Sequence, residues 1–173
     1  MRAMLANGYK LTPEERLLLL LVSGDPGCGA RPQVEAMMAE GALDWEAFIS
    51  LAALQDVVSL LPYSPLWPMV AERLPEELAQ HVKAHRLSVM MTNMAAAAEL
   101  DRLESELISR GLSVIPLKGV ALLKRLYPAM DARRCGDIDL LVRPRDRAAA
   151  YRTLESLGYR PLEDPKPGVA HHP

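Results

Sequence analysis

The sequence predicts an α+β protein in which a helical N-terminal half is followed by a small mixed sheet. Residues 76–110 contain neither glycine nor proline, and their apolar side chains recur every three or four residues, which is the pattern of one long amphipathic helix. At Gly111 this periodicity ends, and short apolar runs then alternate with helical segments. We therefore expect a helical region at 1–110 and a strand-containing region at 111–173.

Several shorter helices should precede the long one. Thr12, followed by a proline and two glutamates, is a typical helix start, and the glycines and proline of 24–27 should end this helix. A short helix is expected at 32–40. Another should begin with Asp44 as its cap and continue toward residue 60.

The long helix should bury one face along its length. Its apolar positions include Val82, Val89 and Leu100 at helical spacing. We interpret Met90 and Met94 as further packing residues of this face, because methionine commonly fills gaps in hydrophobic cores.

The second half alternates strands and helices. Strands are expected at 112–117 and 138–142, with a helix at 120–126 between them. A helix should follow at 144–157, and 159–161 is a candidate third strand.

Composition and charge exclude several function classes. The formal net charge is −2 and aromatic residues make up 5% of the chain, which argues against a general nucleic-acid binder. The apolar run at 17–22 is too short to span a bilayer. Cys28 and Cys135 show no metal-ligand spacing and are expected to be reduced thiols, so we expect a cytoplasmic protein without a membrane partner.

The most informative motif is a pair of carboxylates that opens an apolar run at 137–142. In an extended strand Asp137 and Asp139 would lie on the same face, roughly 6.5 to 7 Å apart along the backbone. Carboxylate oxygens suit hard cations such as Mg²⁺ or Mn²⁺, which often bring a bound phosphate. The alternative is a chance triplet at a turn or a solvated strand edge.

A basic residue and a glycine, Lys118 and Gly119, close the short hydrophobic run that precedes this motif. A cation and a glycine upstream of two metal-binding carboxylates together suggest a nucleotide site.

Five motifs of the second half resemble those of an uncharacterised bacterial nucleotidyltransferase-like family within the DNA polymerase β-type nucleotidyltransferase superfamily. They are VIPLKG at 114–119, LYP at 126–128, Arg133, DIDLLV at 137–142 and LESLGY at 154–159. The resemblance covers roughly residues 43–173 and implies that the second half is a partial polymerase β-type core.

The resemblance also implies roles for individual residues. Asp137 and Asp139 match the catalytic carboxylates that hold the metal ions, Mg²⁺ or Mn²⁺, during phosphoryl transfer. Gly119 matches the glycine that lets the phosphates of a nucleotide approach the backbone at a helix N-terminus.

Lys118 and Arg133 are candidate phosphate partners on the same basis. The alternative for Lys118 is a solvated strand end. The alternative for Arg133 is a salt bridge to a nearby acid, either Asp131 or Asp137.

The superfamily usually supplies a third carboxylate from a later strand, and its expected place lies beyond 171–173. The resemblance therefore implies a C-terminally truncated core, which leaves it uncertain whether the chain is an active enzyme. Glu163 and Asp164 are poor candidates for this role. A short sheet with an exposed edge would also favour self-association.

The leading functional hypothesis is a nucleotidyltransferase-type domain that binds a magnesium–nucleoside triphosphate complex and transfers a nucleoside monophosphate to an unknown acceptor. One alternative is a non-catalytic remnant that acts as an interaction module through its long helix. A less favoured alternative is a glycosyltransferase with an Asp-x-Asp metal site, since no Rossmann-like series of strands and helices precedes the motif.

Overall fold

A computed structural model of the protein describes residues 10–23 and 29–161, and it confirms the α+β class. The helices are α1 (Pro13–Val22), α2 (Ala30–Glu40), α3 (Trp45–Leu54), α4 (Trp67–Ala71), α5 (Glu76–Ser109), α6 (Gly119–Leu126) and α7 (Arg147–Ser156), with 3-10 turns η1 (Leu61–Tyr63) and η2 (Pro144–Asp146). The strands are β1 (Val114–Leu117) and β2 (Asp139–Val142).

The predicted caps form at the starts of two N-terminal helices. Thr12 Oγ1 accepts a hydrogen bond from the Glu15 amide at 3.2 Å, and the Glu15 carboxylate accepts one from the Thr12 amide at 2.8 Å. Asp44 Oδ1 accepts from the Ala47 amide at 2.9 Å and starts α3. The continuation of α3 toward residue 60 is wrong, because the helix ends at Leu54 and Asp56 adopts a left-handed φ of 54°.

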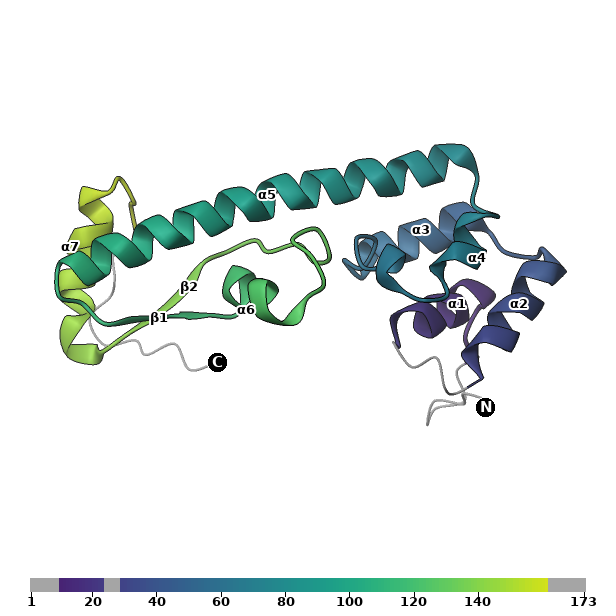
Figure 1. The fold of residues 1–173 in the computed structure, drawn as a ribbon, viewed down its shortest axis with the longest axis horizontal. Coiled ribbons are helices and arrows are strands. Elements are labelled where there is room, and N and C mark those ends of the chain that lie inside the picture. Colours follow the sequence, from purple (N-terminus) through teal and green to yellow (C-terminus); the bar gives the residue numbers. More distant parts are fainter. Residues whose placement is uncertain (1–9, 24–28, 162–173) are drawn as a thin grey trace.

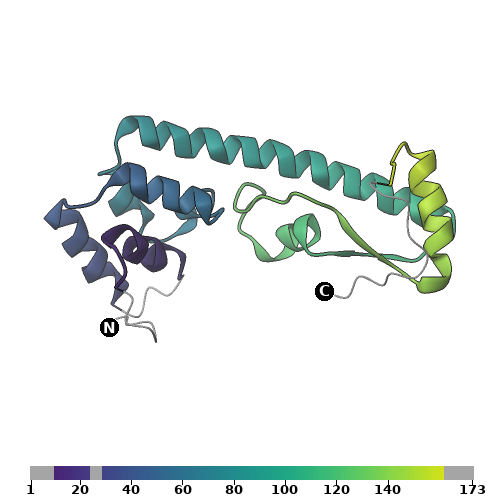
Figure 2. The ribbon, with the colours of Figure 1, turned by 180° about the vertical axis from the view of Figure 1, so that it is seen from behind.

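Helix α5 is the longest element, and it lies along the length of the molecule (Figures 1 and 2). Helices α1–α4 pack beneath one end of it, and the strands with α6 and α7 lie at the other end. Val82 belongs to the N-terminal hydrophobic cluster, Ala97 and Leu100 pack with α6, and Leu107 packs near the strands. A boundary at residue 110 stays a prediction, because α5 contributes to the packing of both regions.

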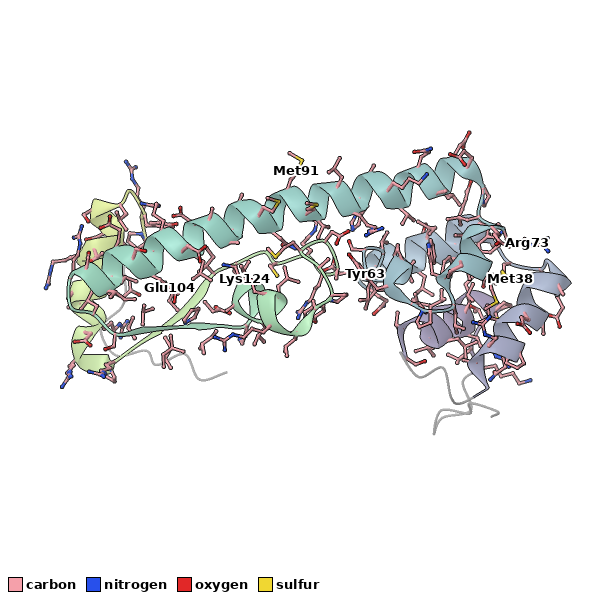
Figure 3. The ribbon with its side chains drawn as sticks, viewed as in Figure 1. Met38, Tyr63, Arg73, Met91, Glu104 and Lys124 are labelled. Atoms are coloured by element: carbon pink, nitrogen blue, oxygen red, sulfur yellow. The ribbon has the colours of Figure 1, made fainter. Side chains whose placement is uncertain are left out.

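The assignment of Met90 and Met94 to the core is wrong. Their side chains are 42% and 53% exposed. Each lies one residue beyond a buried position, Val89 or Asn93, and one residue rotates the direction of a helical side chain by about 100°. Figure 3 shows the neighbouring Met91 pointing away from the rest of the molecule.

The sheet consists of β1 and β2 in antiparallel pairing rather than the mixed sheet that we expected. The candidate third strand at 159–161 is not a strand. Tyr159 instead donates its hydroxyl hydrogen to the Glu99 carboxylate on α5, so this segment is held against the helix and not against a strand edge. Self-association through a strand edge stays a prediction.

The two faces of the sheet have different surroundings. Val114, Leu140 and Val142 pack toward the cluster around Leu107. On the other face Ile115, Leu117 and Leu141 are 57%, 40% and 51% exposed. None of the helices in the described part of the chain is long and apolar enough to cross a membrane.

Candidate active site

The antiparallel pairing of β1 with β2 brings the glycine turn to the paired carboxylates. Leu117, the last residue of β1, pairs with Asp139, the first residue of β2. The turn of Lys118 and Gly119 follows β1 directly, and Asp137 lies in the segment that leads into β2. Four of the five predicted site residues therefore lie at one end of the sheet.

The turn has a backbone that favours glycine. Lys118 has φ 49° and ψ −153°, a region that is costly for any residue with a Cβ atom, and Gly119 has φ 36°. A Cβ atom added to Gly119 would lie 3.1 Å from the backbone oxygen of Asp137. Gly119 is thus the residue that allows the start of α6 to lie against the aspartate segment.

Replacing Gly119 with alanine should push α6 away from the aspartate segment. We expect the change to lower the free energy of unfolding by about 1 to 3 kcal/mol, because the left-handed backbone and the close contact both penalise a side chain. Urea unfolding measures this loss. Gly136→Ala is the matched control, since a Cβ atom there would meet nothing within 4 Å. Equal stability losses in the two variants would contradict the role given to Gly119.

The carboxylates are accessible to solvent. Asp137 is exposed, and the Asp139 side chain is 39% exposed and lies 4.0 Å from the ammonium nitrogen of Lys118. The Lys118 side chain is itself 80% exposed, so this ion pair is weak and open to competition from another cation or an anion.

The donor set suits a magnesium ion, which is usually bound by one or two carboxylates together with water and substrate phosphates. Among the described residues there is no group of three or more histidine, cysteine or acidic side chains arranged to hold a metal. Two exposed carboxylates beside a cation match the partly hydrated mode of binding.

Arg133 lies on the loop between α6 and β2 and does not form the salt bridge weighed as its alternative role. Its guanidinium donates to the Tyr127 hydroxyl at 3.2 Å and lies 5.9 Å from the centre of that ring. Asp131, one of the two acids considered as its partner, pairs with Arg86 instead, at 2.6 Å. The structure places no direct contact between Arg133 and either aspartate of the motif.

A polar cluster joins the N-terminal helices to this loop, and sequence reasoning did not find it. Asp131 accepts hydrogen bonds from Arg86 Nε at 2.8 Å and from the Tyr63 hydroxyl. Figure 3 shows Tyr63 between the N-terminal helices and the loop. Burial alone raises the pKa of Asp131, but the hydrogen bonds from Tyr63 and Arg86 outweigh it and hold that pKa below its ordinary value.

Asn93 on α5 is a second residue that sequence reasoning missed. It is fully buried, and its side-chain amide forms hydrogen bonds with the backbone at Met130, Arg133 and Cys135. Its signal in the sequence is a polar residue in the apolar stripe, four positions after Val89 and four before Ala97.

Lys124 is held by α5. It points from α6 toward that helix in Figure 3 and contacts Asp101 at 3.0 Å. The contact helps to hold α6, whose first residue forms the glycine turn.

A family model described as an uncharacterised nucleotidyltransferase matches residues 41–172. Neither a curated protein nor a solved structure matches the chain.

Proposed function

The chain belongs to the uncharacterised nucleotidyltransferase family, and we propose from this premise that it binds a magnesium–nucleoside triphosphate complex at the end of the β1–β2 pair. One observation carries the proposal, namely that the pairing of Leu117 with Asp139 brings the glycine turn against the Asp-x-Asp segment. We further propose that the core is of the DNA polymerase β type.

Each site residue has a part in this proposal. Asp137 and Asp139 hold the divalent ion, Mg²⁺ or Mn²⁺. When bound, the ion supplies positive charge that stabilises the developing negative charge on phosphate oxygens. The backbone at Gly119 and the N-terminus of α6 face the triphosphate, and Lys118 and Arg133 bind its oxygens.

The proposed reaction is nucleotidyl transfer to an acceptor that carries a hydroxyl or amine. The acceptor lone pair forms a bond to the α-phosphorus, and the bond from that phosphorus to the bridging oxygen breaks. Pyrophosphate leaves with the electron pair, and the acceptor loses its proton to water. The chain residues in this step bind and orient the triphosphate, which is the main protein contribution to phosphoryl chemistry.

Isothermal titration calorimetry with ATP tests the binding step. We expect ATP to bind in the presence of Mg²⁺ and not in EDTA, because the carboxylates repel the triphosphate unless a cation lies between them. Magnesium-independent binding of equal affinity would contradict the proposed arrangement.

Transfer is tested separately with ATP labelled at the α- or the γ-phosphate, incubated with cell lysate as the acceptor source. Relative to lysate alone, the added chain should increase transfer of label only from the α position. We expect weak transfer beside clear binding, because two-metal sites usually draw on more acidic ligands than this pair. An increase in γ-phosphate transfer that the added chain causes would indicate a kinase and would contradict the proposed reaction.

A second candidate function is an interaction module that uses α5. One observation favours it. Leu87, Met91 and Met94 are 59%, 65% and 53% exposed at three- and four-residue spacing, which makes an exposed apolar stripe along α5. Figure 3 shows Met91, the middle residue of this stripe, pointing away from the rest of the molecule. If titration with ATP gives no heat of binding and the protein sediments as a dimer, these results would favour this function over the first.

A further inference from the structure

We propose that Asn93 is a positioning residue for the candidate active site, which it controls through the loop at 127–138. The inference rests on the proposed function, because it assigns the loop the task of presenting Arg133 and Asp137 to a metal–nucleotide complex. Asn93 itself contacts neither of those side chains.

Both N–H groups and the oxygen of the Asn93 amide bond to this loop. Its Nδ2 donates to the backbone oxygens of Met130 at 2.6 Å and Arg133 at 2.7 Å, and its Oδ1 accepts from the Cys135 amide at 3.0 Å. The residue is 0% exposed. A side-chain amide offers two N–H donors and one oxygen, so one side chain holds three backbone groups of the same segment.

The loop needs such a partner because most of it forms no regular structure. Residues 127–138 connect the end of α6 to the start of β2 without helix or strand. Buried backbone groups without a ladder partner are costly unless a side chain or water satisfies them. Asn93 supplies these bonds from α5, which also packs against α6 and β1.

The consequences for the site follow from short chain distances. Arg133 carries one of the three bonded groups, and Asp137 is two residues beyond Cys135. The Asp137 backbone oxygen in turn meets Gly119, so a shift of the loop would move the aspartate relative to the glycine turn. Residues that hold metal-binding side chains in place without contacting the metal commonly contribute to metal affinity, and removing one typically lowers that affinity by about 10- to 100-fold.

The test uses Cys135 as a reporter of loop position. Cys135 is 5% exposed, so iodoacetamide should reach its thiol only slowly while the loop is docked. The measurement is made on the full chain with Cys28→Ser, so that Cys135 is the remaining thiol. Binding of Mn²⁺–ATP is followed in parallel by electron paramagnetic resonance of free Mn²⁺.

Asn93→Ala should raise the alkylation rate of Cys135 by about tenfold or more, because all three bonds to the loop are lost. It should also weaken Mn²⁺–ATP binding by about tenfold or more. Asn93→Asp is the second variant, since it keeps the side-chain volume and the acceptor for Cys135 but turns an oxygen toward the carbonyls of Met130 and Arg133. It should show the same two effects.

Val82→Ala is the matched control on the same helix. Val82 is 3% exposed and belongs to the N-terminal cluster, so this variant destabilises the protein without touching the loop. Measured below the unfolding temperature of every variant, it should leave both the alkylation rate and Mn²⁺–ATP affinity near those of the parent chain.

The outcomes separate the two claims. Fast alkylation of both Asn93 variants with unchanged Mn²⁺–ATP affinity would overturn the positioning role and leave the proposed function intact. Unchanged alkylation would overturn it as well, as would equal effects in Val82→Ala. A parent chain that binds no Mn²⁺–ATP would overturn the proposed function and, with it, this inference.

Discussion

Replacing both Asp137 and Asp139 with asparagine should abolish magnesium-dependent binding of ATP. The two carboxylates are the only acids that the β1–β2 pairing brings to the glycine turn among the described residues. Neutral amides lose the charge that a hard cation requires, so we expect affinity to fall by about 100-fold or more, beyond the loss typical of supporting residues. Calorimetry in Mg²⁺ and in EDTA measures the effect.

The same double variant should remain folded. Asp139 has one ionic partner, Lys118 at 4.0 Å, and both side chains of that pair are substantially exposed. The control is a double variant of two exposed acids in the first turn of α5, Glu76→Gln with Glu77→Gln, which removes equal charge at the other end of that helix. Equal ATP binding by the double aspartate variant and the parent would refute the site, as would equal loss in the control.

Replacing Arg86 with methionine should destabilise the protein by removing an ion pair rather than apolar packing. The variant keeps an aliphatic stem but leaves the Asp131 carboxylate, whose side chain is 12% exposed, without its cationic partner. We expect the free energy of unfolding to fall by about 2 kcal/mol at pH 7. This is less than for a fully buried pair, because the Arg86 side chain is 32% exposed. Urea unfolding measures it.

This loss should depend on pH in a defined direction. In the folded parent the pKa of Asp131 lies below its ordinary value of 3.8, so the pair contributes its full stability above pH 3.8. The contribution disappears as the pH falls through the lowered pKa, because the carboxyl is then protonated in both states. The stability difference between the parent and Arg86→Met should therefore shrink in strong acid.

Lys83→Met is the control for this prediction, since Lys83 is an exposed cation on the same helix. A double-mutant cycle with Asp131→Asn isolates the pair from the contact of Arg86 with the Tyr63 ring, whose centre lies 5.2 Å away. A loss that is the same at pH 7 and at pH 2 would show that lost packing, and not the ion pair, causes it.

Local patterns in the sequence were sufficient for the long helix, for two helix starts and for the main motif. The spacing of apolar residues predicted one long helix at about 75–110, which the structure has at Glu76–Ser109, and Thr12 and Asp44 predicted their caps. These features depend on residues within a few positions of one another, so they can be predicted without knowledge of the fold. The family match at 41–172 agrees with the nucleotidyltransferase resemblance that the motifs carry, while the roles of the individual site residues stay predictions.

Tertiary structure decided the rest. Some features connect segments that are 20 or more residues apart, namely the pairing of Leu117 with Asp139 and the hydrogen bonds of Asn93 and Arg86. The exposure of Met90 and Met94 depends instead on which face of α5 the rest of the chain covers. The sequence alone determined the motif residues, because a motif is a local pattern. The pairing of β1 with β2 decided their placement, because two strands separated by more than 20 residues meet only once the chain has folded.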